Sequence, residues 1–363
     1  MSRKVCAFDL EGPLSFTDFA AEICKLLGSK LRYEKLDEFF QMVSNYDDYL
    51  IEYPQIIKEL GIKSYEPGDT LKLLAPIYVS FFSNSELIEI SKNNIGLIPG
   101  SRQTIDFLRK DWDISIISTS YAQHAYNIAN ALAIPLDHVY CTILDIESTR
   151  GLIENIEDHL GLLIGTIFKN YLAKESRIEA VLDDLNQFFW KSNSDYTRAM
   201  NQIMVRGGHR KEAALVEISE TIGVPISEMI ATGDSITDKD MLRRLSEEGG
   251  IAISFNGNQY SVPYANVAVT SPNLMGVLPI FWKKDNVWEF LTEWETQFPS
   301  FKEDPRKIPN SLLGKGLRQY YITQKFVPHL KNLKGASKIE KEQIIELQKK
   351  MRKEVRGWFG ALG

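Results

Sequence analysis

Val5-Cys6-Ala7-Phe8-Asp9-Leu10-Glu11-Gly12 is the stretch that decides the fold. A short apolar run that ends in carboxylates and a glycine is typical of a buried strand followed by a turn. A second run, Met229–Thr232, is closed by Gly233-Asp234-Ser235-Ile236-Thr237-Asp238 more than two hundred residues later. If the strands led by Lys4–Phe8 and Met229–Thr232 are neighbours in a parallel sheet, their carboxylates meet at its carboxyl edge. Open α/β sheets bind their ligands at that edge.

Four acidic residues stand at these two strand ends: Asp9, Glu11, Asp234 and Asp238. Carboxylates gathered in one crevice repel each other unless a hard cation joins them, and Mg²⁺ held by carboxylates and a substrate phosphate is the usual solution. Taken singly, Asp9 before a glycine also fits ordinary turn chemistry, and Asp238 fits the first turn of a helix. Together the four residues predict a magnesium site for phosphate chemistry.

Two further elements lie between these clusters. The apolar run Ile114–Ile117 predicts a buried strand that leads into Ser118 and Thr119, whose hydroxyls suit a phosphate oxygen. Lys211 precedes the helical pattern Glu212–Ile222, and its ammonium suits a phosphoryl group. The alternatives are that Ser118 satisfies a turn and that Lys211 is solvated.

These four elements, in this order, resemble the haloacid dehalogenase (HAD) superfamily. The first motif is most similar to that of the phosphoserine phosphatase and homoserine phosphotransferase branch. The resemblance covers roughly residues 1–20, 97–145 and 205–270. It implies a doubly wound, Rossmann-like α/β fold with a parallel sheet and helical cap insertions.

The resemblance also implies a role for each motif residue. Asp9 is expected to be the nucleophile that forms an aspartyl-phosphate, and Glu11 the general acid and base. Mg²⁺ is expected as the cofactor, held by Asp9, Asp234, Asp238 and the backbone carbonyl of Glu11. Three residues are expected to bind the transferred phosphoryl group: Ser118, Thr119 and Lys211.

The motifs divide the chain into a core and three additions. The HAD-like catalytic core is predicted from residues 1–14, 97–149 and 204–280. Residues 15–96 and 150–203 show helical periodicity and are predicted to be a helical cap and a second helical insertion. Residues 281–363 are predicted to form a basic helical extension at the carboxyl terminus.

Composition favours an ordinary globular protein. The 363 residues are 44% hydrophobic, and three scattered cysteines, Cys6, Cys24 and Cys141, argue against disulfide stapling. We find no signal peptide and no apolar run long enough to span a membrane, so a cytoplasmic location is expected. We expect no nucleic-acid partner, and a small phosphorylated substrate.

The tail differs in charge from the rest of the chain. From Phe301 onward there are 15 Lys or Arg against 6 Asp or Glu, whereas the first three hundred residues carry 27 against 42. Within it an apolar stripe recurs at helical spacing: Ile344, Leu347, Met351, Val355, Trp358 and Leu362. Such a stripe usually docks on its own core. The alternatives are a protein partner or an anionic membrane surface.

The sequence therefore predicts a Mg²⁺-dependent phosphatase that hydrolyses a small phosphorylated metabolite through an aspartyl-phosphate intermediate. A phosphotransferase would use the same residues and pass the phosphoryl group to a hydroxyl. The alternative from another class is a non-catalytic HAD-like accessory subunit of a larger complex.

Overall fold

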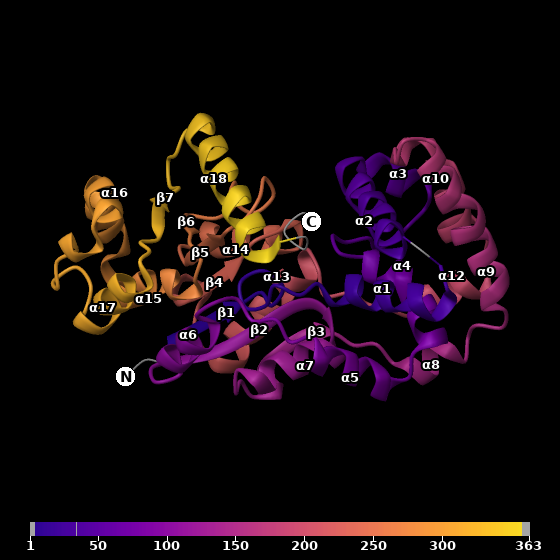
Figure 1. Cartoon of the computed structure of the whole chain (residues 1–363), viewed down its shortest axis with the longest axis horizontal. Helices are drawn as coiled ribbons and strands as arrows, with labels where there is room; N and C mark the ends of the chain where they lie inside the picture. The colour runs from indigo at the N-terminus through magenta and orange to yellow at the C-terminus, as the bar shows by residue number, and fades with distance from the viewer. Residues whose placement is uncertain (1–3, 34, 358–363) are drawn as a thin grey trace.

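Seven strands form one sheet in the order β3-β2-β1-β4-β5-β6-β7 in the computed structural model, which describes residues 4–33 and 35–357. The strands are β1 (Lys4–Phe8), β2 (Trp112–Tyr121), β3 (Val139–Thr142), β4 (Ile230–Gly233), β5 (Ile251–Phe255), β6 (Val267–Thr270) and β7 (His329–Asn332). The strands from β3 to β6 run parallel, and β7 is antiparallel to β6. The order reverses beside β1, so the predicted doubly wound α/β fold is confirmed (Figure 1).

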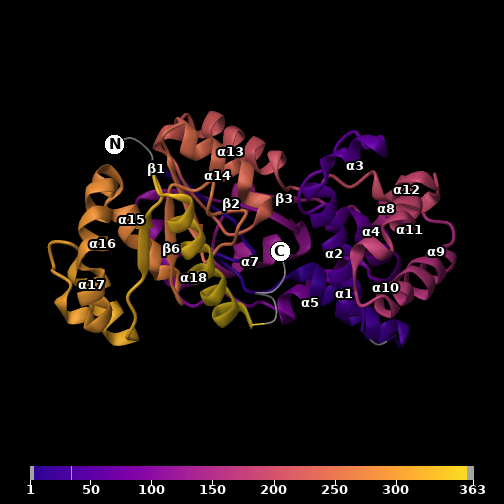
Figure 2. The same cartoon turned by 90° about the horizontal axis from the view of Figure 1, so that it is seen from above.

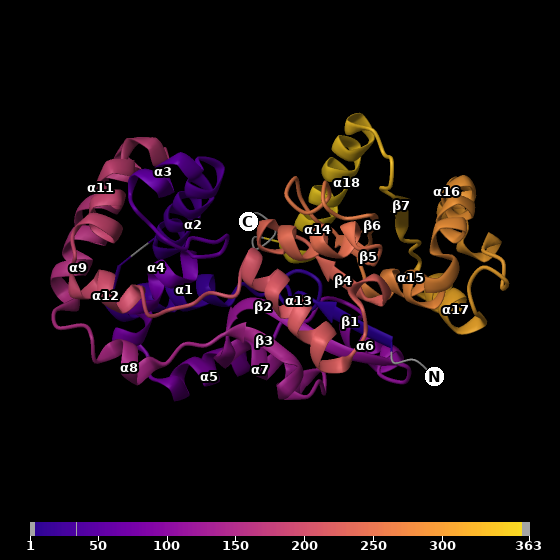
Figure 3. The ribbon, with the colours of Figure 1, turned by 180° about the vertical axis from the view of Figure 1, so that it is seen from behind.

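Helices cover both faces of the sheet. The alternating side chains of β1 show this, because they point to opposite faces and are buried on each. Val5 and Ala7 pack with one group of helices, whereas Cys6 and Phe8 pack with the other. The core helices are α6 (Ser101–Leu108), α7 (Ala122–Ala131), α13 (His209–Ile222) and α14 (Lys239–Glu247). Figure 3 shows the side of the sheet on which α13 lies.

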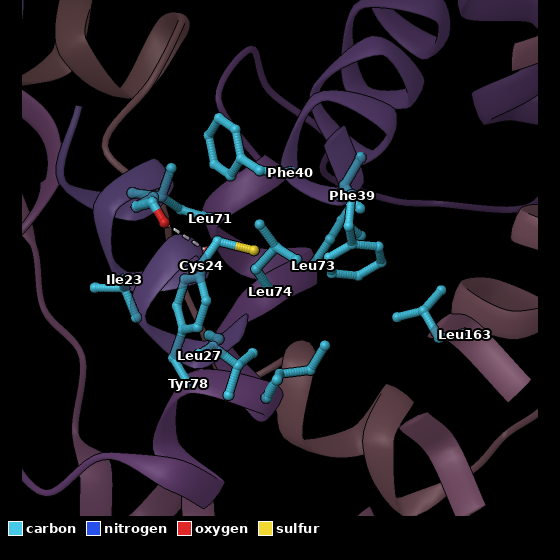
Figure 4. Packing of buried hydrophobic residues seen from close by; sticks show 14 of the residues in the cluster. Ile23, Cys24, Leu27, Phe39, Phe40, Leu71, Leu73, Leu74, Tyr78 and Leu163 are labelled. Carbon is cyan, nitrogen blue, oxygen red and sulfur yellow. Dashed lines mark hydrogen bonds between the residues drawn. The ribbon is translucent and has the colours of Figure 1, made fainter. Parts of the chain in front are cut away.

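The two predicted insertions form one helical unit, the cap. The first contributes α1 (Phe19–Leu31), α2 (Leu36–Glu52), α3 (Pro54–Glu59), α4 (Thr70–Phe81) and α5 (Asn84–Asn93). The second contributes α9 (Ile156–Leu162), α10 (Lys169–Ala173), α11 (Leu182–Asn186) and α12 (Asp195–Met200), entered through α8 (Ile146–Arg150). Both insertions share one hydrophobic cluster, in which the Phe39 and Phe168 rings meet edge to face at 5.5 Å. Figure 4 shows Leu163 of the second insertion on the side of Phe39, in the same hydrophobic cluster as Leu73 and Leu74 of the first.

Each insertion leaves and rejoins the core at one place. The Ser15 hydroxyl donates to the Gly96 carbonyl at 2.8 Å, which closes the base of the first insertion. The Arg206 backbone N–H donates to the Thr142 hydroxyl at 2.9 Å, which closes the second. The cap is therefore joined to the core by two pairs of hydrogen-bonded connecting segments, and it lies beside the carboxyl edge of the sheet (Figure 2).

The C-terminal extension wraps the far end of the sheet and then returns. It contains α15 (Leu278–Trp282), α16 (Val287–Glu303), α17 (Lys315–Gln324), β7 and α18 (Lys338–Arg356). Helix α16 packs against β7, and α18 packs against β6. Figures 1 and 2 show the last turns of α18 between the core and the cap.

Several sequence expectations need correction. The extension is not wholly helical, because β7 adds a strand to the sheet edge. Ser118 and Thr119 belong to the end of β2 and do not follow it. The buried side of α18 carries Ile344, Gln348, Arg352 and Arg356.

The expected apolar stripe is therefore only partly buried. Ile344 is buried, Met351 and Val355 are half-buried, and Leu347 is 39% exposed. The expectations for Trp358 and Leu362 lie outside the described residues. A stripe spaced by three and four residues stays on one face of a helix with 3.6 residues per turn, whereas the buried residues follow a spacing of four and move away from that face by about 40° at each step.

Two further observations concern the whole described chain. Within it, no helix is both long enough and apolar enough to cross a bilayer. The three cysteines, Cys6, Cys24 and Cys141, are buried thiols.

Candidate functional site

The carboxylates of β1 and β4 meet at the sheet edge. The Asp9 backbone N–H donates to the Thr232 carbonyl at 2.8 Å, which joins the ends of the two strands. Oxygen atoms of Asp9, Asp234 and Asp238 lie within 4.8 Å of one another, and all three residues are buried. Asp9 and Asp234, which are more than two hundred residues apart in the chain, therefore lie side by side in the fold.

Lys211 is the cation of this cluster. Its Nζ lies 2.7 Å from Asp9 Oδ1 and 2.7 Å from Asp238 Oδ1, and its side chain is fully buried. Burial opposes the charged form, but Asp238 and Asp9 raise the pKa of Lys211 above its usual value. The ammonium is therefore held charged between two carboxylates.

Asp238 has a second, structural task. Its Oδ2 accepts hydrogen bonds from the backbone N–H groups of Asp234 at 2.9 Å and Ser235 at 3.0 Å. These bonds satisfy the turn after β4 and fix Asp234 at the sheet edge. Asp238 thus positions both Asp234 and Lys211.

The two acids of the first motif, Asp9 and Glu11, have raised pKa values. Burial, with help from Asp238, raises the pKa of Asp9 to about 7 although Lys211 opposes the shift. Burial and the nearby Asp18 raise the pKa of Glu11 to about 8. Glu11 Oε1 accepts from the backbone N–H of Phe19 at 3.1 Å, at the start of α1. A carboxyl that keeps its proton near neutral pH is suited to act as a general acid.

The predicted phosphate-binding hydroxyls take different positions. Ser118 is fully buried, and its Oγ accepts from the Ser120 backbone N–H at 3.1 Å. Thr119 lines the cavity, and its Oγ1 has no hydrogen-bond partner among the described residues. The Thr119 carbonyl accepts from the Thr142 hydroxyl at 2.6 Å, which anchors this end of β2. Of the two residues, Thr119 is the one that lines the cavity.

The cavity lies between core, cap and C-terminal helix. Its volume accessible to a water-sized molecule is about 100 Å³, below the range of about 300–1,000 Å³ that is typical of small-molecule sites. Its core wall includes Asp9, Glu11 and Thr119. The cap contributes eight residues to the wall: Asp18, Phe40, Ser44, Asp47, Asp48, Gly68, Thr70 and Leu71.

Helix α18 forms the third wall of the cavity, and the sequence did not predict this. Arg352 and Arg356 of α18 line the same cavity and reach Asp234. Arg352 Nη1 contacts Asp234 Oδ2, and Arg356 Nη1 lies 3.2 Å from the same oxygen. The available signal was two arginines four residues apart in a helix whose other cations are lysines.

The cluster fits a hard divalent cation. Asp234 Oδ1 is buried and has no hydrogen-bond partner among the described residues, so one ligand atom is free of protein donors. A Cβ at Gly12 would overlap the Asp234 carboxyl group, so a glycine there leaves the carboxylate its space. The donor atoms of Asp9, Asp234 and Asp238 are all oxygens, which Mg²⁺ prefers.

Comparisons with known proteins bear chiefly on the fold. No family model and no curated protein matches the chain. Gene product AF1437 from Archaeoglobus fulgidus matches over 99% of both chains with a TM-score of 0.75 and 24% identity. That match shows a shared fold along 99% of the chain, which includes most of the C-terminal extension.

Other matches are more distant. A phosphoserine phosphatase in apo form matches over 76% of this chain and 98% of its own, with a TM-score of 0.46 and 13% identity. A HAD family hydrolase from Salmonella enterica serovar Typhi matches over 71% of this chain and 64% of its own, with a TM-score of 0.42 and 13% identity.

Proposed function

We propose that the chain is a Mg²⁺-dependent HAD-type phosphohydrolase that acts on a small phosphorylated metabolite through an aspartyl-phosphate. The observation that carries the proposal is Lys211 bridging Asp9 and Asp238 at 2.7 Å, beside Asp234. A buried ammonium between a nucleophile and a second carboxylate has the chemistry needed to receive a phosphoryl group.

The residues divide the reaction into two displacements. Asp9 attacks phosphorus, the bond from phosphorus to the leaving oxygen breaks, and Glu11 gives its proton to that oxygen. Glu11 then takes a proton from water, whose oxygen attacks phosphorus and releases orthophosphate and Asp9. Lys211 and Thr119 hold the phosphoryl oxygens through both steps.

The cation adds charge neutralisation to this scheme. Asp9 and Asp234 would hold Mg²⁺, with Asp238 nearby, and the bound ion would supply Lewis-acid stabilisation of the phosphoryl oxygens. Asp238 keeps the turn after β4 in place, because both of its oxygens already accept hydrogen bonds. The cap walls of the cavity cover one side of the reacting group and so reduce its contact with bulk water.

The test is a screen of phosphorylated metabolites for orthophosphate release, with and without Mg²⁺. We expect release to require Mg²⁺ and to be abolished in Asp9→Asn, whose amide keeps the shape but cannot attack phosphorus. The melting temperature of Asp9→Asn should stay close to that of the unaltered chain or rise, because one buried carboxylate is removed. Full activity in Asp9→Asn would sink the proposed mechanism.

The same screen separates the two other functions. If acceptor alcohols collect the phosphoryl group in place of water, the chain is a phosphotransferase. A non-catalytic HAD-like subunit is favoured by one observation, the two arginines of α18 that hold Asp234. That function predicts no Mg²⁺-dependent release from any substrate.

A further inference from the structure

We propose that α18 is part of the active site, where Arg352 and Arg356 are positioning residues that compete with the divalent cation for Asp234. The inference rests on the proposed role of Asp234 as a metal ligand. It assigns a function to a helix that lies outside all four sequence motifs.

The contacts are buried and converge on one oxygen. Arg352 is 4% exposed and Arg356 is 7% exposed, values that are rare for arginine without a charged partner. Both guanidinium groups contact Asp234 Oδ2, and Arg352 Nη1 also donates to the Asp234 backbone carbonyl at 3.2 Å. Two cations thus share the carboxylate oxygen that lies beside the unpartnered Oδ1.

Gln348 fixes the register of α18 one turn before Arg352. Its Oε1 accepts from the Ser254 hydroxyl at 2.9 Å and from the Gly257 backbone N–H at 2.7 Å. Its Nε2 donates to the carbonyls of Ser254 at 2.9 Å and Val269 at 3.2 Å. A fully buried side chain with four hydrogen bonds to the sheet edge leaves the following turn little freedom.

The start of the helix is fixed as well. Ser337 and Glu340 form a capping box in which each side chain accepts from the other residue's backbone N–H. Ile344 then packs into the core, two turns before Arg352. Contacts at its start and along its length therefore fix α18, and α18 in turn fixes the positions of Arg352 and Arg356.

The charges show what the helix contributes. Seven carboxylic acids line the cavity or belong to the cluster beside it: Asp9, Glu11, Asp18, Asp47, Asp48, Asp234 and Asp238. The core supplies one cation, Lys211, and it contacts Asp9 and Asp238. Arg352 and Arg356 add two positive charges at Asp234, the same charge as one divalent ion.

A divalent ion that approaches Asp234 meets these two charges. Like charges a few ångströms apart in a buried site repel strongly, because little water screens them. Metal affinity is therefore set by a balance between the carboxylates of the core and the arginines of α18. Removing one arginine should shift that balance toward the ion.

The test measures Mn²⁺ binding to the full chain by calorimetry, without any substrate. Arg352→Gln should bind Mn²⁺ at least about tenfold more tightly than the unaltered chain. Arg352→Lys keeps the charge and should stay close to the unaltered chain. Lys349→Gln removes an exposed cation from the same helix and should change the affinity little. Asp234→Asn should lose Mn²⁺ binding at the cluster of Asp9, Asp234 and Asp238. Any Mn²⁺ binding that remains in this variant takes place elsewhere on the chain.

The outcomes separate the inference from the function on which it rests. Arg352→Gln with unchanged or weaker Mn²⁺ binding, beside a loss in Asp234→Asn, would overturn the inference alone. Undiminished binding in Asp234→Asn would overturn both the metal site and the inference. Tighter binding in Arg352→Gln from a chain without phosphatase activity would reject the proposed function and keep the inference.

A second variant guards against misfolding. If Arg352→Gln does not melt cooperatively, Arg356→Gln takes its place, since Arg356 contacts the same oxygen at 3.2 Å. A folded Arg356→Gln chain with no gain in Mn²⁺ affinity would then overturn the inference.

Discussion

Helices α13 and α18 bring cations to the same sheet edge from opposite helix ends. Lys211 lies in the first turn of α13, where the positive end of the helix dipole opposes an ammonium group. Arg352 and Arg356 lie near the end of α18, where the negative end of the dipole favours them. Asp9 and Asp238 therefore hold Lys211 in place although the dipole of α13 disfavours its charge. The charges of Arg352 and Arg356, in contrast, also stabilise α18.

The largest effect should follow from removing Lys211. Lys211→Met leaves Asp9 and Asp238 facing each other without their shared cation, so phosphate release should fall by about 10²–10³-fold. The free energy of unfolding should fall by about 3 kcal/mol, because two buried carboxylates lose their partner. Assays of orthophosphate release and denaturant melts measure the two losses. An unchanged free energy of unfolding would mean that the carboxylates do not need the lysine.

Removing α18 should have the next largest effect. A chain that ends at residue 335 keeps β7 but loses Gln348 and both arginines, so the carboxylates are left with Lys211 alone. We expect a melting temperature lower by several degrees, and a partial recovery in Mg²⁺, which can replace the lost charge. Thermal melts of the truncated and full chains, with and without the ion, measure this. Equal melting temperatures would show that α18 does not stabilise the core.

A single hydrogen-bonding residue tests how α18 is held. Gln348→Leu leaves the Gly257 backbone N–H and the Ser254 hydroxyl without their buried partner, at a cost of about 2 kcal/mol in the free energy of unfolding. Gln343→Leu changes an exposed glutamine of the same helix and serves as the control. Equal losses in the two variants would contradict the anchoring role of Gln348.

The smallest effect concerns a third helix, α2, which brings a carboxylate without a matching cation. Asp47 Oδ2 accepts from the Gly68 backbone N–H at 2.9 Å and the Thr70 hydroxyl at 3.0 Å. Burial, followed by Asp48 and Asp69, raises the pKa of Asp47 from 3.8 to about 8. Because the folded chain holds this proton more tightly than the unfolded chain, stability is lost as pH rises from about 4 to about 8.

Asp47→Asn should remove that loss. The amide keeps an oxygen for Gly68 and Thr70, so the variant should be more stable by roughly 1 kcal/mol or more at pH 8. The gain should shrink toward pH 4, where the acid is neutral in both states. Thermal melts across this pH range provide the measurement. A gain that does not depend on pH would point to a cause other than titration.

The sequence predicted the parts of the site that local patterns carry. Asp9 and Asp234 follow apolar strands directly, and parallel strands bring their ends to one edge, so their meeting follows from chain order and strand direction. Ser118 and Thr119 were both named, but the alternation of β2 decides which one faces the cavity, and a one-residue shift exchanges them. Sequence patterns did not fix that register.

The arginines of α18 escaped prediction for a different reason. Their partner Asp234 lies 118 residues before Arg352 in the chain, and a basic helix face is usually solvated. The apolar residues of the helix also drew attention to a neighbouring face. Strand β7 was not predicted because its residues, His329–Asn332, are largely polar, as edge strands often are.

The distance in sequence between Asp234 and Arg352 has a consequence for synthesis. A ribosome adds about 5–20 residues per second, so the 118 residues between them take about 6–24 s. The carboxylates at the ends of β1 and β4 are therefore made before either arginine. Until Arg352 and Arg356 are made, neither of them competes with a metal ion for Asp234. The order of translation thus gives the ion the first opportunity to bind.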